Sequence, residues 1–503
     1  MKCRGRLLKL IVLMAGMAAT LSFSDAQETA KMETVLLPSS SPLVSFRILF
    51  QVGSASDPQG KEGVAALTAA MISGGGTRKL SYSEIVQAMY PMATRFSSQV
   101  DKEMTVFIGS THKDNLQKYF DLICGMLLEP GWKEEDFSRV KSDAINEIKV
   151  NLRGTNDEEL GKEALYGFIY QGHPYGHYNT GRVAALEKLT LDDVKAFYQA
   201  NYSRRNLVFG IAGNYGPEFL QRAQTRFGSL PEGTRSSLTL PRPEPIEGNQ
   251  VRIIEKGARA TAISLGYPIE ITRSHKDWVA LYLVQSYFGQ HRSSNSYLYQ
   301  RLRELRGLNY GDYAYIEYFP RGMFQFHPDP NLGRRQQIFQ IWIRPVEPQN
   351  AHFALRTAVY ELGKLSREGM KQKDFEDTRR FLSKFVNVLT KTQDLQLGYQ
   401  LDSRYYGIPG FAEYVKTGLA KLTLADVNRV IRENLRAENL MIVIVAQDAA
   451  KLKQALVSNA PSPVHYNAPK PDEILNEDKM LQDYQLKIAE SGVKIIPVEQ
   501  VFQ

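Results

Sequence analysis

The sequence predicts an α+β protein made of two homologous domains, on the basis of an internal repeat, a mixture of strand-like and helical segments, and a proline-rich boundary. The string Lys-Leu-Thr-Leu-Asp-Asp-Val at residues 188–194 recurs as Lys-Leu-Thr-Leu-Ala-Asp-Val at residues 421–427, an offset of 233. Each copy leads into an apolar, strand-like run, at residues 207–212 and 440–445. A repeat over this distance indicates that one domain fold occurs twice.

Within each copy, strands and helices follow one another irregularly. Residues 44–52 and 338–344 are strand-like, whereas apolar side chains recur at helical spacing over residues 134–150. The regular strand–helix alternation of a doubly wound sheet is missing from the pattern. This order favours α+β over α/β.

The first 26 residues are typical of a signal peptide, with a basic start, a 14-residue apolar run and a small-residue cleavage signature at Ser24, Asp25 and Ala26. The run is too short to cross a bilayer comfortably. We therefore expect a periplasmic protein that is soluble after cleavage. Because Cys3 lies in this segment, only Cys124 remains, which excludes an intrachain disulfide.

Prolines and composition divide the rest of the chain. Four prolines within residues 231–250 predict an extended linker, which separates an N-terminal domain at 27–230 from a C-terminal domain at 251–460. Residues 461–503 form a proline-rich segment and a tail. The tail is expected to contain a helix over about residues 471–490 and an extended end, and either straps back onto the body or docks a partner.

The distribution of charge argues against nucleic acid as a partner. The formal charge is +8, but the basic residues are scattered among acidic ones and no Lys/Arg-rich run follows the signal peptide. Nucleic-acid binding is therefore not expected.

An alanine-rich decamer at residues 63–72 precedes three glycines, which predicts a core helix with a glycine stop. The decamer and its lead-in resemble the inverted zinc motif H-x-x-E-H of the pitrilysin and mitochondrial-processing-peptidase (insulinase-type) family of zinc metallopeptidases. In that register Ala66, Ala69 and Ala70 stand where the motif has His, Glu and His. A methyl group has no lone pair for zinc and no proton to exchange, so neither a metal nor a catalytic residue is expected in this chain.

The same resemblance implies a third ligand position. Glu147, 77 residues past Ala70, stands where the family has its ligating glutamate, and is expected to be an orphan ligand-equivalent. An ordinary helix glutamate also fits the pattern, and one carboxylate does not make a zinc site. His173 and His177 are separated by proline and glycine and resemble a scaffold turn of the family, so we interpret both as structural.

Residues 298–310 resemble the family segment Leu-Arg-Glu-x-x-Gly-Leu-x-Tyr. The resemblance implies that Arg303 and Tyr310 contact the substrate backbone near the scissile bond, and that in two-subunit bacterial members they come from the subunit without zinc. A guanidinium and a phenol both donate hydrogen bonds to a peptide carbonyl. Arg306 is the alternative if the register differs. Residues 95–100 correspond to the strand that pairs with extended substrate, although an ordinary edge strand fits equally well.

The resemblance covers about residues 35–460 and implies paired domains with antiparallel sheets that form half of a clamshell. It predicts a non-catalytic subunit of a periplasmic, heterodimeric zinc metallopeptidase. The partner would carry zinc and the general base, while this chain contributes chamber wall and substrate-binding residues for unfolded peptides. The alternative is a stand-alone peptide-binding or structural protein that reuses the inactive fold. An enzyme with a relocated site is least favoured, because no suitable constellation is visible.

Overall fold

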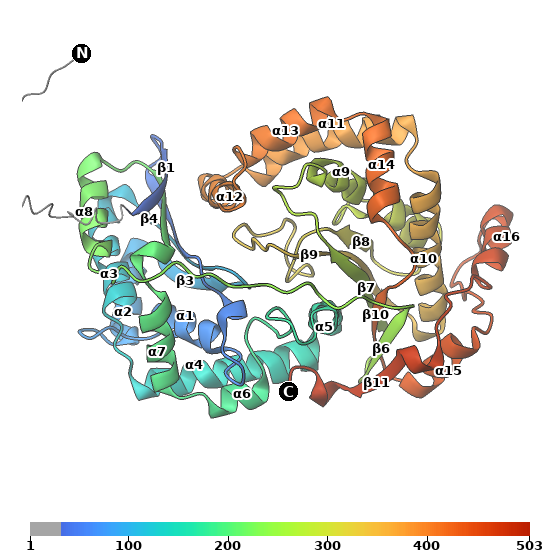
Figure 1. Cartoon of the computed structure of the whole chain (residues 1–503), viewed down its shortest axis with the longest axis horizontal. Coiled ribbons are helices and arrows are strands. Elements are labelled where there is room, and N and C mark those ends of the chain that lie inside the picture. The colour runs from blue at the N-terminus through green and yellow to red at the C-terminus, as the bar shows by residue number, and fades with distance from the viewer. Residues whose placement is uncertain (1–31) are drawn as a thin grey trace, which may run out of the picture. The chain divides into compact units, whose positions relative to one another are not determined.

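The computed structural model describes residues 32–503 (Figure 1), so the predicted signal peptide lies outside the described residues. Within this range the strands form one sheet of five strands, in the order β1-β5-β2-β4-β3, and one of six, in the order β11-β6-β10-β7-β9-β8. Apart from β11, the second order repeats the first strand for strand. The predicted α+β class with two helix-packed sheets is confirmed.

Both sheets are mixed, because an antiparallel centre is extended by parallel pairs at β1–β5, β6–β10 and β6–β11. The first sheet contains β1 (Glu33–Pro38), β2 (Leu43–Phe50), β3 (Arg95–Val100), β4 (Thr105–His112) and β5 (Leu207–Gly213). The second contains β6 (Gln250–Glu255), β7 (Thr261–Ile269), β8 (Asp312–Tyr315), β9 (Gln337–Val346), β10 (Met441–Ala446) and β11 (Val493–Pro497).

The helices follow the same repeat. The first half contains α1 (Val64–Gly74), α2 (Tyr82–Met89), α3 (Leu116–Leu128), α4 (Glu134–Asn146), α5 (Asp157–Ile169), α6 (Val183–Lys188), α7 (Leu191–Asn201) and α8 (Pro217–Phe227). The second contains α9 (Trp278–Gly289), α10 (Ala351–Glu368), α11 (Gln372–Leu389), α12 (Gln393–Tyr406), α13 (Phe411–Lys421), α14 (Leu424–Asn434), α15 (Ala449–Ser458) and α16 (Asp472–Leu481). The repeated heptapeptide starts α7 and α14, where Thr190 with Asp193 and Thr423 with Asp426 form matching capping boxes.

Two further segments are π-helical, η4 (Glu147–Thr155) and η6 (Tyr299–Glu304). The helix expected over residues 134–150 is therefore α-helical only as far as Asn146. Such π-helical turns recur at functional sites. Here they carry Glu147 and Arg303, two of the residues that the family resemblance singled out.

Helices α5 and α12 occupy equivalent positions in the repeat, and each packs on the sheet of the other half. Helix α5 packs on β7, β9 and β10 of the second sheet, whereas α12 packs on β1, β2 and β5 of the first. Leu397 and Leu401 of α12 are buried against Leu49, Val106 and Val208 of the first sheet. Each sheet thus has one face covered by a helix from the other half of the sequence.

The tail folds back onto both halves. Strand β11 joins the edge of the second sheet beside β6, and Phe502 then reaches the core of the first half, where the carbonyl oxygen of Val501 accepts a 2.7 Å hydrogen bond from Nε of Arg153. Helix α16 ends at Leu481 rather than near residue 490. Leu486 and Ile488 bury alternate side chains in the second core, which requires extended chain instead of helix.

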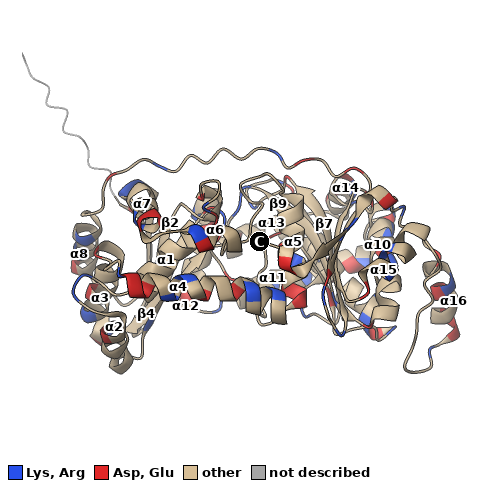
Figure 2. Ribbon diagram, turned by 90° about the horizontal axis from the view of Figure 1, so that it is seen from below, with Lys and Arg blue, Asp and Glu red and all other residues tan. Residues whose placement is uncertain are grey.

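Residues 231–249 form neither helix nor strand and lead from the first sheet to the second in an extended path (Figure 2). Lys/Arg and Asp/Glu positions are interspersed along the helices in the same view. No helix between Met32 and Gln503 is both long and apolar enough to cross a membrane.

Candidate functional site

A cavity of about 500 Å³ lies beside α1, and its other walls are β3, α4, Tyr82 of α2 and the loop residues Asn179 and Thr180. Ala66, Ala70 and Ser73 of α1 line it. The side chain of Asp57 fixes the start of this helix, since its carboxylate accepts hydrogen bonds of 2.6 and 2.9 Å from the backbone N–H groups of Gly63 and Ala65. A carboxylate at this place satisfies otherwise unpaired N–H groups and favours the positive end of the helix dipole.

The structure brings two of the three substituted motif positions to this cavity. Ala66 and Ala70 are partly exposed there, whereas Ala69 is fully buried in the core. Glu147 is not among the residues that line the cavity. It lies at the start of η4, where its carboxylate accepts a 2.7 Å hydrogen bond from Nδ2 of Asn151.

The residues present do not fit a zinc ion. Ala66 and Ala70 offer no donor atom, and Asp143 is the one carboxylate that lines the cavity. Nowhere in residues 32–503 do three or more His, Cys, Asp or Glu side chains gather in a group that could hold a metal ion. No chemistry of this chain is therefore derived from a bound metal.

Two polar features of the cavity were not found from the sequence. The hydroxyl groups of Ser73 and Ser98 lie 2.9 Å apart and join α1 to β3. The guanidinium of Arg139 forms ion pairs with Asp136 at 3.2 Å and with Asp143 at 3.9 Å, so the charges at the rim are already paired. The contact between Ser73 and Ser98 joins residues 25 apart and leaves no mark in local spacing. The Arg139 pairs lie at i,i+3 and i,i+4 on α4, so their spacing was the signal that could have found them.

The equivalent place in the second half, formed by α9, β8 and α11, is largely filled. Only about 70 Å³ remains, because the chain after β8 folds over it and contributes Ile316, Tyr318 and Phe319. The Phe319 ring packs against Tyr315 and against His291, with ring centroids 5.2 and 4.7 Å apart. The cavity beside α1 has no such cover from its own half.

Acidification is expected to destabilise the protein through His291. Its Nδ1 lies 2.8 Å from the Tyr315 hydroxyl and its Nε2 2.8 Å from the carbonyl oxygen of Gln325, and burial lowers its pKa from 6.5 to about 3. Between pH 6.5 and 3 the unfolded chain binds this proton and the folded chain does not, so the free energy of unfolding falls as the pH falls. The loss is about 1.4 kcal/mol per pH unit below 6.5.

Urea unfolding at pH 7 and pH 5.5 measures this effect. His291→Gln should reduce the pH dependence by the contribution of this histidine, while the buried His352, whose pKa burial also lowers to about 3, keeps its own. The same change at the more exposed His275 should leave the pH dependence as in the wild type. Equal slopes in the wild type and His291→Gln would contradict the assignment.

The segment at residues 298–310 exposes the side chains of Arg303 and Tyr310 to solvent. Arg303 is partly exposed and, within residues 32–503, forms no ion pair or side-chain hydrogen bond, and Tyr310 is 76% exposed. Arg306 is buried instead: its Nε donates to Asp478 at 2.9 Å and its Nη2 to Glu477 at 2.7 Å. Neither Arg303 nor Tyr310 is among the residues that line the cavity beside α1.

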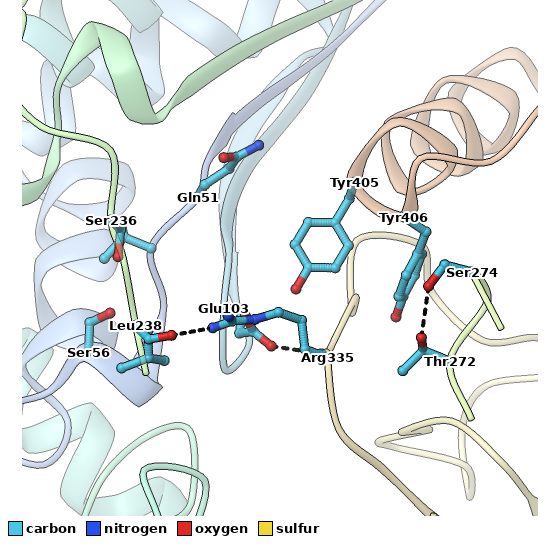
Figure 3. Close-up of a pocket in the computed structure, with 11 residues that line it drawn as sticks. Gln51, Ser56, Glu103, Ser236, Leu238, Thr272, Ser274, Arg335, Tyr405 and Tyr406 are labelled. Carbon is cyan, nitrogen blue, oxygen red and sulfur yellow. Dashed lines mark hydrogen bonds and ion pairs between the residues drawn. The ribbon is translucent and has the colours of Figure 1, made fainter. Parts of the chain in front are cut away.

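A second cavity of about 430 Å³ lies under the linker, between the end of β2 and α12 (Figure 3). Its charged residues satisfy each other, because Arg335 donates to the Glu103 carboxylate and also, at 2.8 Å, to the carbonyl oxygen of Leu238. Tyr405 and Tyr406 of α12 line the opposite side. This paired arrangement leaves no free charge to recognise a ligand.

A buried arginine joins the two halves near this cavity. Arg334 is 1% exposed, donates to both carboxylate oxygens of Asp101, and lies 3.6 Å from the ring centroid of Tyr318. Burial lowers the pKa of the neighbouring Lys102 to about 7 and raises that of Glu163 to about 7. Nothing in the local sequence marks this pair, because Arg334 and Asp101 are 233 residues apart.

Two α+β halves with the same strand order, and the lack of any metal-holding group of side chains among residues 32–503, agree with the peptidase-like class that the sequence resemblance implies. A family profile described as insulinase (peptidase family M16) matches residues 34–178, and one described as peptidase M16 inactive domain matches residues 188–382. The chain belongs to the insulinase (M16) family.

Similar proteins are distant in sequence. An uncharacterized zinc protease of Rickettsia felis is 24% identical over 303 residues, which are 59% of this chain and 70% of that protein. A solved structure of a peptidase M16 inactive domain from Pseudomonas fluorescens has a TM-score of 0.72 at 21% identity, covering 83% of this chain and 96% of its own. The periplasmic protease PqqL of Escherichia coli has a TM-score of 0.65 at 14% identity, covering 92% of this chain and 50% of PqqL. The structural matches show the fold, and this chain spans half the length of PqqL.

Proposed function

We propose that this chain is the non-catalytic subunit of a periplasmic, two-subunit zinc metallopeptidase. A family member with an intact H-x-x-E-H motif would carry zinc and the general base, and this chain would supply chamber wall and the substrate contacts of Arg303 and Tyr310. The proposal includes the sequence-based division into domains at 27–230 and 251–460. Its substrates would be unfolded peptides, because a closed chamber excludes folded proteins.

One observation carries the proposal: the arginines of η6 and of the turn after it differ in whether they form ion pairs. Arg301 and Arg306 are tied to Glu477 by ion pairs, whereas Arg303 keeps its guanidinium free of such contacts among the described residues. An arginine with no structural partner keeps its hydrogen-bond donors for a ligand such as a peptide carbonyl. The half-length match to PqqL supports a protein that acts with a second such unit.

The test is a peptidase assay on fluorogenic unstructured peptides, with this chain alone, a co-encoded zinc-bearing relative alone, and the two mixed, and with zinc measured in each. We expect activity to rise strongly only in the mixture. Arg303→Ala should lower the activity of the mixture about 100-fold, since it removes a charged donor near the reacting carbonyl. Arg259→Ala, on the exposed loop between β6 and β7, is the matched control and should change little.

The other outcomes are equally informative. Neither association nor stimulation would favour a stand-alone peptide-binding or structural protein. Zinc-dependent cleavage by this chain alone would overturn the assignment of the alanine-substituted helix as non-catalytic.

A further inference from the structure

We infer that Glu477 is a positioning residue, which holds the segment that carries Arg303 by bridging two arginines on either side of it in the sequence. The inference deepens the proposed function, and it rests on that function only where activity is measured. It assigns a role to residues 462–482, which we call the arm, a part of the tail that the proposed function does not use.

The arm leaves the second half and returns to it at one closed base. The backbone N–H of Ser462 donates a 3.0 Å hydrogen bond to the carbonyl oxygen of Gln482. The buried guanidinium of Arg356 on α10 donates to that same carbonyl and, at 2.9 Å, to the Ser462 hydroxyl. Between these points the arm contains α16, which packs on α10 at the outer edge of the second half (Figure 1). Because its base is fixed, the arm is held beside α10, against which η6 also packs.

Glu477 of α16 is the one carboxylate, among the described residues, that pairs with both Arg301 and Arg306. One of its oxygens accepts a hydrogen bond from Nη2 of Arg301, and the other accepts one of 2.7 Å from Nη2 of Arg306. Each arginine also has a carboxylate of its own, respectively Glu361 and Asp478. Loss of Glu477 would therefore remove the link between the two arginines without leaving either of them unpaired.

The backbone between the two arginines is held as well. Nη1 of Arg306 donates a 2.8 Å hydrogen bond to the carbonyl oxygen of Arg301. Nζ of Lys470 on the arm donates one of 2.9 Å to the carbonyl oxygen of Leu305. Arg303 lies between these fixed points, so less conformational entropy is lost when its guanidinium binds a ligand.

The bridge depends on a charged carboxylate. Partial burial raises the pKa of Glu477, but hydrogen bonds from Arg306 and Arg301 outweigh this effect and hold the pKa below its ordinary value. The carboxylate is therefore charged at neutral pH, where charge-assisted hydrogen bonds are about twice as strong as neutral ones. Glu477→Gln keeps the size of the side chain and removes the charge, so it weakens the bridge without opening a cavity.

Hydrogen exchange of the full mature chain, measured without any partner, is the first test. We expect the backbone amides of residues 298–310 to exchange about tenfold faster in Glu477→Gln. Lys470→Met, which removes only the bond to the backbone, should act in the same direction more weakly and serves if Glu477→Gln is not folded. Glu473→Gln, at an exposed position on the same helix, is the matched control and should exchange as the wild type. Thermal unfolding verifies that each variant is folded.

Kinetics of the mixture with the zinc-bearing relative are the second test. Glu477→Gln should lower kcat about tenfold and keep KM within about twofold of the wild type, because a misplaced donor costs most in the transition state. In the Arg303→Ala background the same change should lower kcat no further, since Glu477 acts through Arg303. A change that only lowered stability would reduce activity in both backgrounds.

Three results would overturn the positioning role. These are unchanged exchange in residues 298–310, an unaffected kcat in the mixture, or an equal loss of kcat with and without Arg303. If the wild-type mixture shows no stimulation, the proposed function fails, and the exchange rates alone decide whether Glu477 holds the segment.

Discussion

Replacing Arg334 with methionine is expected to lower the free energy of unfolding by about 3–5 kcal/mol. The side chains of Arg334 and Asp101 are 1% and 0% exposed, and their carboxylate–guanidinium contact is bidentate. Methionine would leave the Asp101 carboxylate buried with only Asn179 as a remaining side-chain donor, at 2.9 Å. The cost of an uncompensated buried charge exceeds the cost of the lost packing. Urea unfolding measures the change.

Two further variants identify the cause. Arg380→Met removes an arginine whose side chain is 71% exposed and paired with Asp377, and should change stability by less than about 0.5 kcal/mol. The double variant Arg334→Met with Asp101→Asn should recover part of the loss, because it removes the orphaned charge. If Arg334→Met alone were within about 1 kcal/mol of the wild type, the pair would not stabilise the contact between the halves.

Phe502→Ala is expected to cost about 3 kcal/mol, although the residue is next to last in the chain. Phe502 is 5% exposed, and its ring lies against that of Tyr178 with centroids 5.6 Å apart. Its carbonyl oxygen accepts a 3.0 Å hydrogen bond from the backbone N–H of Val183. Removing the ring would leave a cavity at the point where the tail is anchored to the first half.

Glu499→Ala is the matched control, because Glu499 is exposed in the same segment and should change stability little. Hydrogen exchange gives a second measurement: β11 should exchange faster in Phe502→Ala, since its far anchor is lost. An unchanged free energy of unfolding in Phe502→Ala would mean that the tail lies on the body without stabilising it.

The parts of the fold that were predicted depend on local signals. The repeated heptapeptide contains its own capping box, so the starts of α7 and α14 follow from a few adjacent residues. The exchange of α5 and α12 could not be predicted in this way. Both helices have the composition of ordinary covering helices, and which sheet they cover depends on contacts between distant parts of the chain.

The same distinction between local signals and distant contacts applies to the candidate site. That the alanines at 66, 69 and 70 replace the motif's His, Glu and His stays a prediction from the sequence, which needs only the absence of donor atoms. The distinction between Arg303 and Arg306 needed the structure. Arg306 is fixed by Glu477 and Asp478, which lie 171 and 172 residues later, and nothing in its own segment marks it as buried.

Because α5 and α12 are exchanged, each half of the chain depends on the other to complete its fold. A chain severed within residues 231–249 would keep every interlocking contact, whereas either half produced by itself would expose one apolar sheet face and carry one helix with nothing to cover. The halves thus behave as complementary fragments rather than interchangeable modules. The same strand order therefore occurs twice within one compact unit, and neither half completes it alone.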